Sequence, residues 1–171
     1  MEKIEKISAV VISVMVVVSG IASTAIAYDA NNPWTGTVKW SIPSDTSFTV
    51  TFAGSQTQIN FTASGKNDTL IEPDGQDAVA ETPIITIENT GNTNLNFKCN
   101  LTSAKPSWVT HLKVCSTPFV IDATDFNTTL VLINSSIAPG ESTPMYLWSY
   151  IENAPAGTTT RTLMIVSEQS A

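Results

Sequence analysis

The sequence predicts an all-β fold: a single antiparallel β-sandwich, immunoglobulin-like or jelly-roll-like, with about eight or nine strands behind an N-terminal apolar helix. Three observations predict this class. Short runs of residues alternate between apolar and polar, which is typical of half-buried strands. Turn-forming residues separate these runs. No stretch after residue 28 keeps the periodicity of an amphipathic helix.

The alternating runs are the expected strands. The clearest is NLNFKCNL at residues 94–101, where apolar side chains occupy every second position. The longest connection, residues 64–82, is expected to hold a loop or a small extra hairpin. The expected strands span residues 37–42, 47–53, 58–63, 83–88, 94–101, 108–115, 128–134, 143–151 and 160–167.

Glycine and proline mark the joints between these strands. Glycine adopts positive φ without steric cost, and proline fixes the φ angle that many turns require. Such residues lie between neighbouring runs, so each run is expected to be a separate strand. The turn segments are residues 42–45, 53–56, 89–92, 139–142 and 153–157.

The composition favours an exposed β protein and excludes a nucleic-acid partner. Charged residues make up only 13% of the chain, and the formal net charge is −7. Phosphate backbones require clustered lysine and arginine, which this chain lacks. Thr, Asn and Ser supply the polarity instead, which suits strands with one solvated face.

Residues 1–27 read as an export signal, which leaves residues 28–171 as the sandwich domain. The segment 7–27 contains no charged side chain and ends in Ala-Ile-Ala before Tyr28. Two alternatives stay open. Glu2 and Glu5 offset the two lysines, and the apolar run is about as long as the ~20 residues that span a bilayer, so an uncleaved anchor is one of them.

The other alternative is a retained helix like that of type IV pilins, although no glycine precedes the apolar run. All three interpretations place most of the chain outside the cytoplasm, secreted or at the cell surface. A membrane would be contacted only through an uncleaved leader.

Cys99 and Cys115 are the only cysteines, and an extracellular location favours a disulfide between them. A loop of this size would stabilise the fold by about 3 kcal/mol. Two free buried thiols are the main alternative. Zinc binding or cysteine chemistry has little support, because the chain has one histidine, His111.

N-glycosylation signals of the form N-x-S/T are dense. A glycan cannot enter a core, so occupied sites would have to face solvent. Ordinary polar strand and turn residues are the alternative interpretation. The candidate asparagines are Asn60, Asn67, Asn100, Asn127 and Asn134.

The remaining candidate ligand sites are acidic or aromatic. Asp74 and Asp77 flank Gly75 in an acidic segment, and carboxylates around such a turn can hold calcium; a solvated acidic loop is the alternative, and no other cofactor is expected. Aromatic side chains can stack on sugars, although in strands they more often pack in the core. The tryptophans are Trp34, Trp40, Trp108 and Trp148.

Three segments carry a resemblance to known proteins. Residues 86–92 followed by 95–97 resemble the strand–NTGN–strand start of immunoglobulin-like modules in archaeal and bacterial surface proteins. Residues 137–142 are similar to their PGES element. Residues 156–158 resemble the segment before their last strand, with Thr where an aromatic is usual. The resemblance covers residues 83–167, about half of the mature chain.

The same resemblance extends to TasA-like and archaeal bundling-pilin subunits, which are secreted β-sandwiches that polymerise into extracellular fibres. It implies a non-enzymatic structural role, as a subunit of a surface layer, sheath or filament. The alternative is a secreted or membrane-anchored carbohydrate-binding or adhesion module. The motifs of hydrolases, P-loop proteins and dinucleotide-binding proteins do not occur, so we expect no enzyme.

Self-association by strand addition or lateral packing is the expected interaction. Val38, Trp40 and Ile42 alternate with polar residues and form a candidate donor strand that could complete the sheet of a neighbouring copy. Pairing of residues 37–42 within their own subunit is the alternative, because consecutive strands usually pair locally.

Overall fold

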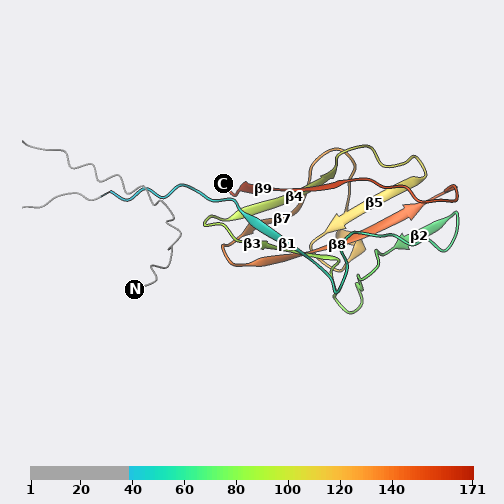
Figure 1. Ribbon diagram of the computed structural model, residues 1–171, viewed down its shortest axis with the longest axis horizontal. Coiled ribbons are helices and arrows are strands. Elements are labelled where there is room, and N and C mark those ends of the chain that lie inside the picture. Colours follow the sequence, from blue (N-terminus) through green and yellow to red (C-terminus); the bar gives the residue numbers. More distant parts are fainter. Residues whose placement is uncertain (1–38) are drawn as a thin grey trace, which may run out of the picture. The chain divides into compact units, whose positions relative to one another are not determined.

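The computed structural model describes residues 39–171, and the chain divides into two units, residues 1–43 and 44–171. All strands of the described residues belong to the second unit (Figure 1). The expected leader, Trp34 and Val38 lie outside the described residues. No helix of the described part is long and apolar enough to cross a membrane.

The larger sheet has six strands, and all of its neighbours pair antiparallel. Its order is β1–β3–β8–β5–β6, and β2 also pairs with β8. Because β3 pairs with the first half of β8 and β2 with the second, the long strand β8 organises the whole sheet. The strands are β1 (Phe48–Phe52), β2 (Asp68–Ile71), β3 (Ile85–Asn89), β5 (Val109–Cys115), β6 (Thr124–Asp125) and β8 (Ser142–Ile151).

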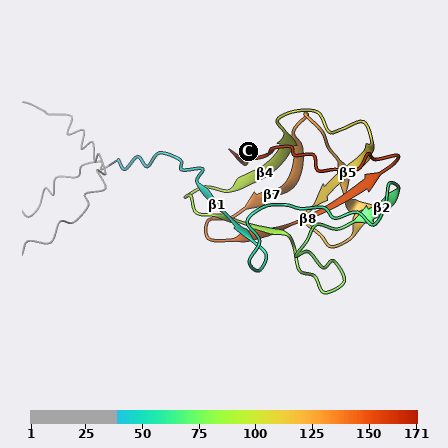
Figure 2. The same cartoon turned by 45° about the vertical axis from the view of Figure 1, so that its right-hand side comes forward.

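The smaller sheet has three antiparallel strands in the order β7–β4–β9. They are β7 (Val131–Ile137), β4 (Leu95–Leu101) and β9 (Leu163–Gln169). Figure 2 shows β4 and β7 in a layer of their own, facing β8. A short 3-10 helix, η1 (Val120–Asp122), connects β5 to β6.

One apolar cluster lies between the sheets. Apolar side chains of β4 alternate into it, and Phe97 and Cys99 are fully buried. Ile85 and Ile87 of β3, together with residues of β8, face them from the larger sheet. Period-two alternation therefore predicted the core correctly, and the all-β fold with two antiparallel sheets is confirmed.

Two expected strands are absent from the described residues, and two short strands were not expected. Lys39–Ile42 form no strand. Residues 58–63 contribute a single bridge, between Phe61 and Pro73, because proline has no N–H with which to extend a ladder. The connection 64–82 contains β2, and β6 is a two-residue strand beside β5. The expected strand at 128–134 begins three residues later, as β7 at Val131.

Gln76 completes the larger sheet between β3 and β2. Its side-chain Nε2 donates to the carbonyl of Leu147 at 2.9 Å, and its Oε1 accepts from the N–H of Leu147 at 2.8 Å. The amide of a buried side chain thus takes the place of a strand backbone at the one point along β8 where the neighbouring strand changes.

Asn89 connects two of the turns that carry the family resemblance. Its Nδ2 donates to the carbonyls of Thr93 and Ile137, each at 2.8 Å, and its Oδ1 accepts from the N–H of Gly91 at 3.0 Å. Its backbone also bonds to Gly140 and Glu141 of the turn before β8. Because Asn89 is fully buried, these bonds fix the 89–92 turn against the 139–142 turn.

The expected disulfide is not formed, and both cysteines are free thiols. Cys99 faces the core between the sheets, whereas Cys115 belongs to a second cluster, with Tyr146 and Trp148, on the outer face of the larger sheet. Val114 precedes Cys115 and points into the core, so the alternation of β5 turns Cys115 outward. Two side chains on opposite faces of a sheet cannot be bridged.

Candidate functional site

Lys39–Ile42 precede the sandwich as an exposed apolar segment, here called the lead segment. Its Trp40 side chain is 70% exposed and Ile42 is 79% exposed. These are two of the three candidate donor residues. Isolated exposed apolar residues are common on proteins, but here a Trp and an Ile two positions apart are both exposed.

The chain just after the lead segment is firmly attached to the sandwich. The Asp45 N–H donates to Oδ1 of Asn92 at 2.6 Å, and the Asp45 carbonyl accepts from the N–H of Asn92 at 3.1 Å. Ser167 of β9 donates its hydroxyl to the Thr46 carbonyl at 2.7 Å. The turn at 89–92 therefore defines where the lead segment leaves the sandwich.

Gly91 is required for this attachment. A Cβ atom at this position would overlap the carbonyl oxygen of Asp45 and lie 3.2 Å from the N–H nitrogen of Ser47. The opposing atoms belong to the backbone, so they cannot move aside as a flexible side chain would. The glycine of the NTGN motif thus has a packing role as well as a turn role.

Several strands present open edges among the described residues. β1 and β6 end the path of the larger sheet, and β7 and β9 end the smaller sheet. The edge strands β1 and β9 carry partly exposed apolar residues, Val50 and Met164. Unpaired backbone groups at such edges can accept a strand from another chain.

A groove of about 340 Å³ lies on the outer face of the larger sheet. The β8 side chains alternate, so Met145 and Leu147 enter the main core while Tyr146 and Trp148 point to the outer face. Trp148 is 1% exposed and forms part of the groove wall. Two connections cover this face, the 72–82 segment from one side and the chain around η1 from the other.

Hydrogen bonds hold these covering segments in place. The indole Nε1 of Trp148 donates to Oε1 of Glu72 at 3.3 Å, and the Tyr146 hydroxyl donates to the Glu81 carbonyl at 2.8 Å. Burial raises the pKa of Tyr146, and the nearby Glu81 carboxylate adds to this shift. The phenol therefore stays protonated and able to donate.

Apolar side chains remain exposed around the groove. Phe119 is 60% exposed, Val79 is 97% exposed and Leu70 is 46% exposed, and Glu72 and Glu81 lie beside them. Sequence reasoning missed this surface because it treated 64–82 and 116–127 as connections. The available signal was the presence of large apolar residues within those polar segments.

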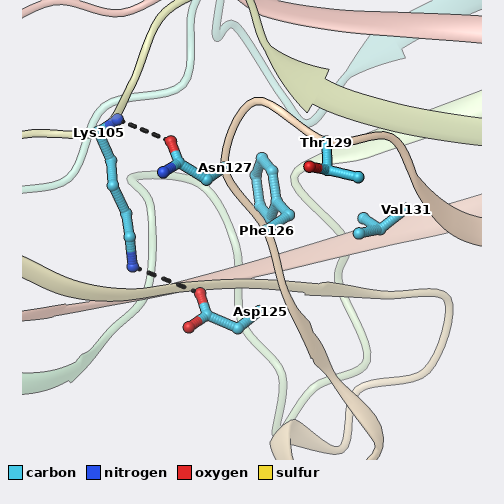
Figure 3. Close-up of a pocket in the computed structure, with 6 residues that line it drawn as sticks. All are labelled: Lys105, Asp125, Phe126, Asn127, Thr129 and Val131. Atoms are coloured by element: carbon cyan, nitrogen blue, oxygen red, sulfur yellow. Dashed lines mark hydrogen bonds and ion pairs between the residues drawn. The ribbon is translucent and has the colours of Figure 1, made fainter.

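A second pocket, of about 240 Å³, lies beside β6 (Figure 3). Lys105 Nζ is 3.6 Å from Oδ1 of Asp125, and the Lys105 N–H donates to Oδ1 of Asn127 at 2.9 Å. Oδ2 of Asp125 lies 2.8 Å from Nδ1 of His111, whose ring packs edge-on against Tyr150. His111 and Asp125 resemble the base and orienting acid of a triad, but both are substantially exposed.

The charged groups of this pocket have a structural effect. Partial burial would raise the pKa of Asp125, but hydrogen bonds from His111 and from the Leu112 N–H, together with the Lys105 charge, outweigh burial and lower it. The ionised carboxylate thereby fixes β6 against β5. The contacts of His111 are thus accounted for by strand pairing.

The five glycosylation candidates lie in different environments. Asn60 and Asn67 are exposed, whereas Asn100, Asn127 and Asn134 are half-buried. Nδ2 of Asn100 donates to the Thr128 carbonyl, and Nδ2 of Asn134 donates to the hydroxyl of buried Thr143. A glycan replaces one of the two hydrogens on such a nitrogen, so at these sites it would have to fit beside an existing hydrogen bond.

The calcium candidates already have protein partners. Oδ2 of Asp74 accepts from Nδ2 of Asn60 at 2.6 Å, and Oδ1 of Asp77 accepts from the N–H of Ala80 at 2.9 Å. Within residues 39–171, the structure brings together no group of three or more side chains that could hold a metal ion.

The tryptophans of the described chain do not form one aromatic platform. Trp148 is buried, Trp108 is half-buried and Trp40 belongs to the lead segment. Stacking on a sugar requires an exposed ring face, so Trp148 is unavailable for it.

The chain matches no protein-family model, and comparison with curated proteins and with solved structures finds no similar protein.

Proposed function

We propose that this protein is an exported, non-enzymatic structural subunit of a cell-surface layer, sheath or filament, and that its immunoglobulin-like sandwich associates with further copies. The observation that carries the proposal is the lead segment. Trp40 and Ile42 are exposed, and they precede a domain with open sheet edges. Association would remove this apolar surface from water.

The attachment of the lead segment supports a role between subunits. The chain is bound to the sandwich from Asp45 onward, yet Lys39–Ile42 pair with no strand of the described residues. A segment that alternates Trp40 and Ile42 with polar residues can add to an open sheet edge or pack laterally on a neighbour. In both arrangements a second copy supplies the strand or the surface against which the lead segment packs.

The proposal includes export with cleavage after Ala27 and glycosylation on the outer surface. Asn67 is the best candidate acceptor, because it is exposed and its Oδ1, not its Nδ2, bonds to the N–H of Asn153 at 2.7 Å. Intact-mass measurement of material from native cells, before and after deglycosylation, reports both modifications. An unmodified mass that includes residues 1–27 would contradict both.

Self-association is tested by sedimentation velocity and electron microscopy of the exported full chain over a range of concentrations. We expect concentration-dependent assembly, and we expect the double variant Trp40→Ala, Ile42→Ala to prevent it. Leu130→Ala is the control, because it also removes an exposed apolar side chain, from a residue outside the edge strands. A full chain that stays monomeric at every concentration would refute the proposed function.

A further inference from the structure

We infer that the groove on the outer face of the larger sheet binds the lead segment of a second copy of this chain, with Trp40 and Ile42 in contact with Phe119, Val79 and Leu70. This inference rests on the proposed function and names the surface that accepts the lead segment. It is carried by three observations: where exposed apolar residues occur, the charges of the two surfaces, and the reach of the chain.

The exposed apolar residues concentrate on these two surfaces. Within residues 39–171, ten large apolar side chains are exposed, and three of them line the groove while two lie in the lead segment. Ile121, 90% exposed, belongs to η1 beside the groove. A groove of about 340 Å³ is at the small end of ligand pockets, which suits an aromatic side chain from a peptide segment.

The charges of the two surfaces are complementary. Glu72 and Glu81 line the groove, and no lysine or arginine of the described chain does. Lys39 is exposed and immediately precedes Trp40 in the lead segment. Opposite charges at the rim of an apolar contact orient the partner, and they add a modest part of the affinity.

The reach of the chain favours a second copy over the same copy. Asp45 is held at the 89–92 turn, and five residues span at most about 18 Å, so the Cα of Trp40 stays within that distance of Asp45. Ser142 pairs with Glu88 beside this turn, and Trp148 lies six residues further along β8, about 20 Å from Ser142. Binding within one copy would therefore require an extended chain between Asp45 and Trp40, whereas a second copy imposes no such restraint. A head-to-tail contact of this kind, between two different surfaces, also propagates into a chain of copies.

Val79→Glu tests the groove, because Val79 is 97% exposed and its replacement leaves the core intact. Leu132→Glu, on the exposed side of β7, is the matched control. In sedimentation velocity of the full chain, we expect Val79→Glu to raise the concentration needed for association at least tenfold, and the control to change it less than twofold. Equal behaviour of the two variants would overturn the inference.

A charge exchange tests the orientation of the bound segment. Lys39→Glu and Glu81→Lys should each weaken self-association, by about fivefold for an exposed pair. An equimolar mixture of these two variants should associate more strongly than either alone, because the new carboxylate of one copy then meets the new ammonium group of the other. If the mixture associates no more strongly than either variant alone, the charge pairing is refuted. If contact between the lead segment and the groove does not depend on protein concentration, the segment binds within one copy.

The outcomes separate this inference from the proposed function. If the Trp40→Ala, Ile42→Ala chain stays monomeric while Val79→Glu assembles normally, the lead segment acts at another surface and only the groove assignment is wrong. If the unaltered full chain never associates, and a peptide of residues 37–43 does not bind it, both proposals fail. If glycans bind the groove and the peptide does not, the groove is a carbohydrate site, and the inference is overturned.

Discussion

The side-chain amide of Gln76 replaces a strand backbone beside β8, and its substitution by leucine tests how much of the sheet depends on it. Gln76 is 9% exposed, and both of its bonds go to the backbone of Leu147, at 2.8 and 2.9 Å. Leucine has a similar size but bonds to neither group. The Leu147 N–H and carbonyl would then be buried without partners.

The expected cost follows from those two groups. Each buried polar group left without a partner costs about 1–3 kcal/mol, so Gln76→Leu should lower the free energy of unfolding by about 2–6 kcal/mol. That is a large fraction of the ~5–15 kcal/mol stability of an ordinary domain. Gln76→Glu should also destabilise, because a carboxylate cannot donate to the Leu147 carbonyl and would bury a charge.

Urea unfolding of the chain from Tyr28, followed by fluorescence, measures this change. The midpoint should fall while the m-value stays constant, since the native fold is retained. Gln58→Leu is the control, because Gln58 is exposed and should change stability by less than about 0.5 kcal/mol. If Gln76→Leu were as stable as the control, the side chain would not complete the sheet and the reasoning would be refuted.

Three further predictions concern the turn, the thiols and acid stability. Gly91→Ala should destabilise the fold by about 1–3 kcal/mol in the same urea assay, because the new Cβ would overlap the Asp45 backbone. Gly65→Ala should be neutral, because its Cβ would come no closer than 4.0 Å to another group. Equal stability of the two variants would contradict the packing role of Gly91. Alkylation with mass detection should find two free thiols when the chain is unfolded without reductant. In the native protein Cys99 should not react, because burial raises its pKa to about 12. A mass that shows a Cys99–Cys115 bond would refute the β5 register. Because the pKa of Asp125 is lowered in the folded chain, the unfolded chain binds this proton first as pH falls, so the contribution of Asp125 to stability is present above about pH 4 and lost below it. Asp125→Asn should therefore flatten the fall in the free energy of unfolding below about pH 4. An unchanged slope would refute the ion-pair assignment.

Period-two alternation predicted the core strands well because each of them has one buried face. The expected strand 94–101 is β4 at 95–101, and the expected strand 143–151 is β8 at 142–151. The alternation failed where apolar residues pack without a ladder. Ile59 and Phe61 are partly buried against the core, but the strand that should pair with them is interrupted at Pro73.

The groove could not be predicted because its residues come from β2 and from two connections that fold back over one sheet. Phe119 is far in sequence from Leu70 and Val79, and all three lie in polar segments. Their proximity depends on long-range bonds such as that from the Tyr146 hydroxyl to the Glu81 carbonyl, which no local pattern encodes. A period of two puts Tyr146 and Trp148 on one face of β8, but the sequence does not show that connections cover that face.

The cysteine error shows how the same pattern could have been used more fully. In a strand over residues 108–115, a period of two puts Leu112 and Val114 on one face and Cys115 on the other. In β4 the apolar alternation includes Cys99 itself, so Cys99 had to point into the core. Compartment and cysteine count favoured a disulfide, but strand register opposes it, and register prevails because a covalent bond cannot pass through a sheet. Outward-facing Cys115 instead packs with Tyr146 and Trp148 in the cluster beneath the groove, so the register of β5 helps to build the surface to which we assign the lead segment.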